Sequence, residues 1–236
     1  NQRGGDCRRP YYQYAKETLT DCQPIGKGKK VMIGFYNYSV ILTYIGLASA
    51  LFGMTQAISG NIKISLVCLM ISGICDMFDG KIARSMKRTE DEKRFGIQID
   101  SLCDLVCFGV FPAIIGYSIG MKSPVCVIFL VCYVLAALIR LAFFNVMEEK
   151  RQSETDALMK YYRGMPVTMA ALIFPAVFLV HFLMNIPLVM IYSAGIVIVA
   201  FLFVLDFKVK KAGQAAMIFM SLVGIGILVG LMVFCK

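Results

Sequence analysis

The segment CLMISGICDMFDGKIAR, residues 68–84, decides the fold, because it begins as an apolar membrane helix and then carries acidic side chains. Asp76 and Asp79 are three positions apart, which places both carboxylates on one side of a helix. A charged residue at the centre of a membrane helix costs roughly 2.5 to 3.5 kcal/mol on insertion scales. We therefore expect these carboxylates to have a functional role that offsets this cost.

The rest of the chain has the composition of a membrane protein. Of its 236 residues 58% are hydrophobic, tryptophan is absent and the mean hydropathy is +0.72. This composition excludes an ordinary soluble domain. A membrane-spanning helix needs about 20 mostly apolar residues. We predict an all-α, polytopic integral membrane bundle of about seven transmembrane helices, at residues 34–57, 62–80, 97–120, 123–147, 165–184, 186–205 and 212–235.

The distribution of basic residues predicts the orientation of the bundle. The chain has 24 Lys and Arg and a net charge of +9. Twenty of the 24 fall in four regions, residues 1–33, 81–95, 148–163 and 206–211. These regions share one side of the membrane if seven helices alternate, and cytoplasmic loops are enriched in Lys and Arg. We expect them on the cytoplasmic side of the cell membrane, where they attract anionic lipid, and we expect no nucleic-acid partner.

The two ends of the chain differ in character. Residues 1–31 are polar and basic, and we predict a cytosolic, poorly ordered extension there, followed by a membrane domain at residues 32–236. Met32 directly precedes the first predicted helix. We therefore expect either that the native protein begins at Met32, or that residues 1–31 are a cytosolic tail with a small partner-binding role.

A second acidic stripe follows in the segment GIQIDSLCDL, residues 96–105, where Gly96, Asp100 and Asp104 recur at four-residue intervals. The two acidic helices run in opposite directions, so both stripes lie at the same membrane depth and are able to face each other. Any single Asp could merely solvate a helix end, but four converging carboxylates would repel one another strongly. Hard divalent cations such as Mg²⁺ and Mn²⁺ prefer oxygen ligands, and we predict a divalent metal site.

The first stripe continues beyond its carboxylates. Gly80 and Ala83 follow Asp76 at i+4 and i+7, on the same side of the helix. Glycine leaves room for a nucleotide diphosphate to approach. Arg84, near the cytoplasmic end, has a planar guanidinium suited to phosphate. We expect residues 85–95 to form a loop, with the acidic residues at 90–92 in a solvated turn.

Together the two stripes resemble the signature of the CDP-alcohol phosphatidyltransferase family. That signature has two Asp separated by two residues, then Gly, two residues, Ala-Arg and a spacer, and then Gly, Asp and Asp with three residues between each. The spacer here, residues 85–95, is longer than is usual in the family. The stretches FGIQIDSLCDLVCFGVFPA from Phe95, IRLAFFNV from Ile139 and KYYRGMPVT from Lys160 are similar to the branch that acts on serine.

This resemblance implies a metal-dependent transfer of a phosphatidyl group from CDP-diacylglycerol to the hydroxyl of L-serine, with release of CMP. It implies two Mg²⁺ or Mn²⁺ ions bound by Asp76, Asp79 and Asp100, with Asp104 completing the second site and acting as general base. It also implies a homodimer. The residues that it assigns to CDP-diacylglycerol binding are Gly80, Ala83, Arg84 and Gly96.

Four further residues are candidates for contact with the acceptor or with phosphate. Arg140 lies about seven residues inside the end of its predicted helix, and we expect it to hold the lipid phosphate or the serine carboxylate with the help of Asn145. A buried ion pair or a side chain that reaches the surface is the alternative. Lys160 and Arg163 precede the next helix, where they are either substrate contacts or ordinary cytoplasmic flanking residues.

Two other functions compete with this one. The first keeps the family but changes the acceptor to glycerol 3-phosphate or an inositol phosphate, either of which would demand a dense basic pocket. The second belongs to another class, a cation transporter with intramembrane carboxylates at its ion site. A transporter predicts acidic residues near the bilayer midplane and a repeated half, whereas the four Asp cluster toward one face and no repeat is evident.

Overall fold

The structure, a computed structural model, describes residues 38–85, 89–154, 161–206, 208–210 and 214–234. The chain divides into two units, residues 1–34 and Phe35–Lys236, and all the described residues belong to the second. The predicted extension at residues 1–31 lies outside the described residues.

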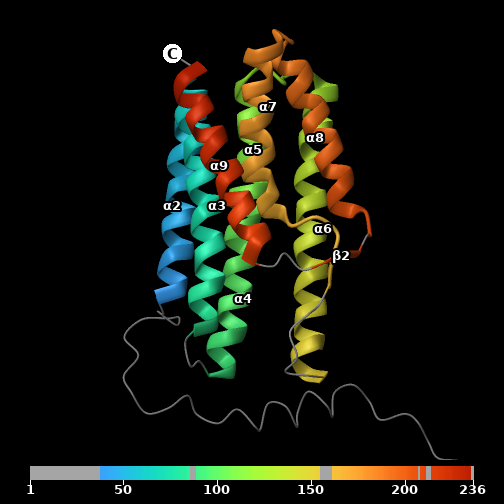
Figure 1. The fold of residues 1–236 in the computed structure, drawn as a ribbon. Helices are drawn as coiled ribbons and strands as arrows, with labels where there is room; N and C mark the ends of the chain where they lie inside the picture. The colour runs from blue at the N-terminus through green and yellow to red at the C-terminus, as the bar shows by residue number, and fades with distance from the viewer. Residues whose placement is uncertain (1–37, 86–88, 155–160, 207, 211–213, 235–236) are drawn as a thin grey trace, which may run out of the picture. The chain divides into compact units, whose positions relative to one another are not determined.

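The second unit is a bundle of long helices (Figure 1). Within the described residues its helical segments match the seven predicted helices in order, because α4, η1 and α5 form one continuous helix and η2 leads directly into α7. The predicted fold class is therefore confirmed. The segments are α2 (Tyr38–Ile58), α3 (Ile62–Ser85), α4 (Glu90–Asp104), η1 (Leu105–Val110), α5 (Phe111–Ser118), α6 (Pro124–Glu154), η2 (Val167–Met169), α7 (Ala170–Met184), α8 (Leu188–Val204) and α9 (Gln214–Phe234).

Four stretches within the described residues are long and apolar enough to span a membrane: Val40–Ile58, Asp91–Ser118, Pro124–Glu149 and Val167–Met184. Two shorter apolar stretches, Leu188–Val204 and Met220–Val233, lie in α8 and α9. Helix α3 is long enough, but every 18-residue stretch of it contains at least three charged side chains, more than a simple spanning helix carries. The chain is therefore an integral membrane protein, and the charged side chains of α3 distinguish this helix from the four spanning stretches.

The predicted loop at residues 85–95 is mostly helix, so the expectation of a loop was wrong. Helix α4 begins at Glu90, and Thr89 and Glu92 form a capping box at its start. The Thr89 hydroxyl accepts a bond of 3.3 Å from the Glu92 amide, and the Glu92 carboxylate accepts one of 2.9 Å from the Thr89 amide. This reciprocal pair satisfies two N–H groups that the first turn leaves free. The acidic residues that were expected in a solvated turn therefore start the helix and fix its register.

A π-helical segment, η1, follows directly after Asp104. Pro112 lacks the N–H group that would bond the carbonyl of Phe108, four residues earlier. The Tyr133 hydroxyl donates to this carbonyl instead, at 2.6 Å, and the Tyr192 hydroxyl donates to the Pro112 carbonyl at 2.9 Å. Both tyrosines are fully buried. These bonds tie the helix to α6 and α8 at the point where its winding changes.

Helix α2 packs closely on α3 because small residues line their contact. A Cβ atom on Gly46 would lie 3.2 Å from the Cβ of Cys75. The buried Ser72 hydroxyl donates to the Gly46 carbonyl at 2.8 Å, so the two helices are also joined by a hydrogen bond. Helix α2 packs against α4 as well. It is therefore a neighbour of both acidic helices.

A short strand pair was not predicted. Strand β1 (Tyr161–Arg163) pairs in antiparallel register with β2 (Lys208–Lys210), with Tyr162 opposite Val209. The pair joins the segment after α6 to the segment after α8. It is too short to change the fold class, and it anchors two basic regions of the chain to each other.

Candidate active site

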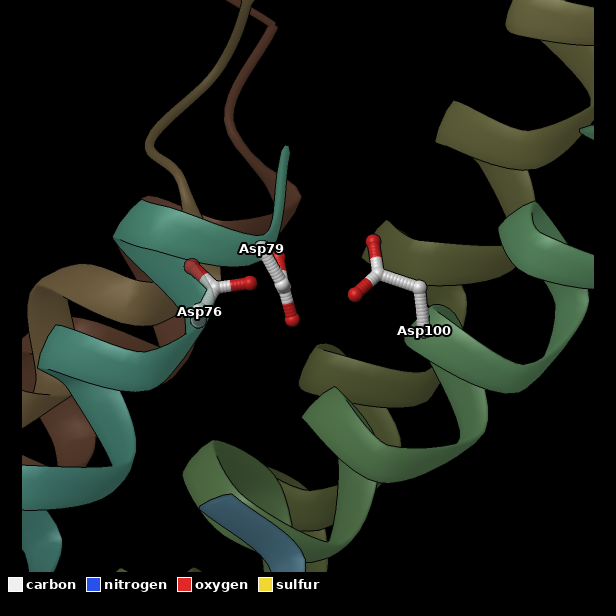
Figure 2. A group of neighbouring side chains, drawn as sticks. All are labelled: Asp76, Asp79 and Asp100. Carbon is white, nitrogen blue, oxygen red and sulfur yellow. The ribbon is translucent and has the colours of Figure 1, made fainter. Parts of the chain in front are cut away.

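Three of the predicted carboxylates converge between α3 and α4. Asp76 and Asp79 of α3 point toward Asp100 of α4 across the space between the helices (Figure 2). One carboxylate oxygen from each residue can be chosen so that all three atoms lie within 4.8 Å of one another. Asp79 is buried, whereas Asp76 and Asp100 are partly exposed. The two stripes predicted that four carboxylates would converge, and three of them meet in this group.

Asp104 lies one turn further along α4 and is not part of this group of three within the described residues. Its carboxyl group is within hydrogen-bonding contact of Asp76. It is therefore a neighbour of the three carboxylates at the side where the π segment begins.

The electrostatics of the group favour a cation. Among the side chains that the structure describes, the charged groups that act on Asp76 and Asp100 are other carboxylates. Two like charges about 5 Å apart repel by about 3 kcal/mol at an effective dielectric constant of about 20. Oxygen ligands of Mg²⁺ at about 2.0–2.1 Å lie at most about 4.2 Å apart. Side-chain shifts of less than about 1 Å would close the group around one ion, so its residues fit a hard divalent cation.

The glycines of the signature border the acidic group. Gly80 is in α3 beside Asp79, and a Cβ atom built on it would meet no heavy atom of the described residues within 4 Å. Gly96 is in α4, one turn before Asp100, and is partly exposed. Ala83 and Arg84 continue α3, but their side chains lie outside the described part of the structure. Open space therefore adjoins the acidic group at Gly80.

Arg140 is a buried cation on α6, at 8% exposure. Its Nε donates to the Met165 carbonyl at 3.2 Å, and its guanidinium carbon lies 5.8 Å from the centre of the Phe144 ring. Gly164 has φ +74°, and a Cβ atom on it would lie 3.3 Å from the Arg140 Nε. Among the described side chains Arg140 has no acidic partner, so the alternative of a buried ion pair finds no support there.

Asn145 is not a partner of Arg140. The Ser101 hydroxyl of α4 donates to the Asn145 Oδ1 at 2.7 Å, so Asn145 faces α4. Arg140 precedes it by five residues, or about 140° around the helix, and contacts the turn before α7. Asn145 instead joins α6 to the residue next to Asp100.

The remaining two candidates cannot be placed beside the acidic group. Lys160 lies outside the described residues. Arg163 is the last residue of β1, paired with Lys208, and its side chain is not described. Their predicted contact with acceptor or phosphate stays a prediction.

Two polar contacts at the site were not predicted from the sequence. Thr43 of α2 donates from its hydroxyl to Oδ2 of Asp79 at 2.9 Å, and Ser101 makes the bond to Asn145. The only signal for Thr43 was a polar residue within an apolar helix. No local pattern indicates which neighbouring helix such a residue faces.

The fold and the site define an integral membrane helix bundle with an acidic, cation-compatible site between two of its helices. A model of the CDP-alcohol phosphatidyltransferase family matches residues 36–205, and the chain belongs to that family. The matched region contains every described acidic site residue and ends at α8. The family resemblance inferred from the two stripes is therefore confirmed.

Several relatives are named CDP-diacylglycerol--serine O-phosphatidyltransferase. The protein of Saccharomyces cerevisiae is 38% identical over 100 residues, that of Mycobacterium bovis 29% over 131 residues, and that of Methanocaldococcus jannaschii 29% over 161 residues. The alignments cover 42%, 55% and 67% of this chain, respectively. They cover 35%, 44% and 71% of those relatives, so the chain matches less than half the length of the first two.

Proposed function

We propose that this protein transfers the phosphatidyl group of CDP-diacylglycerol to the hydroxyl of L-serine and releases CMP, with a bound Mg²⁺ or Mn²⁺. The observation that carries the proposal is the convergence of Asp76, Asp79 and Asp100 between two membrane helices. Membership of the CDP-alcohol phosphatidyltransferase family supports the reaction class. The names of the relatives support serine as the acceptor.

The acidic residues have distinct roles in this proposal. Asp76, Asp79 and Asp100 hold the divalent cation, and Asp104 completes a second cation site beside Asp76. The bound cation would neutralise charge on the pyrophosphate and on the departing CMP. Asp104 accepts the proton of the serine hydroxyl. The serine oxygen then forms a bond to the phosphorus that carries diacylglycerol, and the bond from that phosphorus to the CMP oxygen breaks.

The remaining signature residues position the donor. Gly80 and Gly96 leave room for the nucleotide, and Ala83 and Arg84 line its phosphate side. The open space at Gly80 supports this placement. Phosphoryl transfer depends mainly on positioning and electrostatic stabilisation, which a cation and an arginine supply together.

Arg140 is the proposed contact for the serine carboxylate or the lipid phosphate. Its Nε bond to the Met165 carbonyl uses one of five N–H donors and fixes the plane of the guanidinium. Lys160 and Arg163 remain candidates for the same role. Asn145 acts through Ser101 by holding α6 against α4.

The site is proposed to face the cytoplasm of the cell membrane, because 20 of the 24 basic residues fall in regions that would share that side. The C-terminal end of α3, the N-terminal end of α4 and the C-terminal end of α6 lie at one end of the bundle (Figure 1). A homodimer is proposed from the family resemblance alone. A cation transporter loses its support, since the family model covers all the acidic site residues.

An acceptor panel tests this function. Purified full-length protein in detergent micelles, supplied with CDP-diacylglycerol and Mn²⁺, is expected to release CMP with L-serine at least about tenfold faster than with glycerol 3-phosphate, inositol phosphate or D-serine. Mass spectrometry of the lipid product identifies the acceptor that was used. Faster transfer to a phosphorylated acceptor would assign the protein to another branch of the family. No CMP release with any acceptor would reject the proposal.

A further inference from the structure

Thr43 brings a third helix, α2, into the acidic site. Its side chain is 8% exposed, and its hydroxyl donates to Oδ2 of Asp79, which is 4% exposed. The two residues are 36 positions apart in the chain. The contact therefore exists only because α2 packs beside the acidic end of α3.

The hydrogen bond from Thr43 leaves the Asp79 carboxylate able to act as a cation ligand. A hydroxyl is a neutral donor, so it fixes the orientation of a carboxylate and leaves the negative charge in place. A Lys or Arg in the position of Thr43 would neutralise that charge and compete with a bound cation. A carboxylate has about four acceptor positions. Asp79 accepts from Thr43 and from the Gly80 backbone N–H, so two of these positions stay available with respect to the described residues.

The backbone that carries Thr43 is itself held in register. About one turn further along α2, the Gly46 carbonyl accepts the 2.8 Å bond from Ser72. About one turn beyond Gly46, the Ser49 hydroxyl donates to the Cys68 carbonyl at 3.2 Å. Two hydrogen bonds independent of the acidic site thus fix α2 against α3. The packing of α2 on α3 therefore places the Thr43 hydroxyl beside Asp79.

We propose that Thr43 is a positioning residue that orients the Asp79 carboxylate for divalent cation binding. This inference rests on the cation site of the proposed function. Partners of this kind, which contact a metal ligand and not the metal, typically change metal affinity about 10–100-fold when they are removed. The alternative is that the bond serves only to pack α2 on α3.

The test measures Mn²⁺ binding to the purified full-length protein by electron paramagnetic resonance, without substrates. Thr43→Val keeps the shape of the side chain and removes the hydroxyl, and we expect it to raise the Kd for Mn²⁺ about 10–100-fold. Thr43→Ser keeps the hydroxyl, and we expect its Kd to stay within about threefold of the original value. Thermal unfolding without metal shows whether each variant is folded.

Two controls separate the possible failures. Ser49→Ala removes another α2–α3 hydrogen bond away from the acidic group, and it should leave the Kd unchanged. Asp79→Asn should abolish specific binding. If Thr43→Val binds Mn²⁺ normally, or if Thr43→Ser and Ser49→Ala weaken binding as much as Thr43→Val does, the positioning role is wrong. If the original protein binds no Mn²⁺, or Asp79→Asn binds it normally, the cation site of the proposed function is wrong.

Discussion

Asp100→Asn is expected to reduce CMP release at least about a thousandfold. The substitution keeps the shape of the side chain and removes one negative charge from the group of three carboxylates. A bound cation contributes several kcal/mol of transition-state stabilisation, and about 4 kcal/mol corresponds to a thousandfold in rate. The measurement is serine-dependent CMP release at saturating CDP-diacylglycerol, over a range of Mn²⁺ concentrations.

The same variant should fold at least as stably as the original protein without metal. Removing one of three clustered charges relieves repulsion, so we expect an equal or higher unfolding temperature together with lost activity. Asp91→Asn is the matched control, because Asp91 is an exposed acidic residue on the same helix, and it should keep nearly full activity. Near-normal turnover in Asp100→Asn would exclude a catalytic cation held by Asp100.

Gly80→Leu is expected to lower kcat/KM for CDP-diacylglycerol at least about 100-fold. Within the described part of the chain, a Cβ atom on Gly80 meets no heavy atom within 4 Å, so none of the described residues excludes a larger side chain there. Leu is also about 0.5–1 kcal/mol more favourable than Gly inside a helix. The expected loss therefore arises from the space that the nucleotide would occupy. Steady-state kinetics and thermal unfolding together distinguish a blocked site from a damaged fold.

Gly226→Leu is the matched control for this variant. Gly226 lies in α9, and a Cβ atom on it likewise meets no heavy atom of any described residue within 4 Å. It should change neither activity nor folding appreciably. If Gly80→Leu retained full activity, the proposed approach of the nucleotide along this side of α3 would be wrong.

The acidic site was predictable from the sequence because its geometry is mostly local. The intervals between Asp76 and Asp79, and between Gly96, Asp100 and Asp104, place each set on one side of its helix. Opposite helix directions then bring the two sets to one depth. The structure was needed to show that three of the four carboxylates form one group and that Asp104 lies beside it.

The start of α4 was predictable but was missed. Thr89 and Glu92 have the spacing of a capping box, which outweighs the loop character of the surrounding charges. The π segment is different. Pro112 indicates that the carbonyl of Phe108 lacks its usual helical partner, but it does not indicate that the helix changes from α to π winding at this point. The partner of this carbonyl is Tyr133, which belongs to another helix, α6.

Contacts between distant helices could not be predicted in the same way. Thr43 and Asp79 meet because α2 packs on α3 through small residues, and Ser101 meets Asn145 because α6 lies beside α4. A single apolar helix has many directions in which to face a polar side chain. The neighbour is chosen by the packing of the whole bundle, which periodicity along one helix does not encode.

The central claim is that Asp76, Asp79 and Asp100 together hold a divalent cation. The most direct measurement is anomalous diffraction at the manganese edge from crystals of the protein grown with Mn²⁺ and CDP. The account predicts an anomalous peak between α3 and α4, within coordination distance of a carboxylate oxygen from each of the three residues. A map with clear density for CDP and no peak at these carboxylates, or with the peak on other residues, would contradict it.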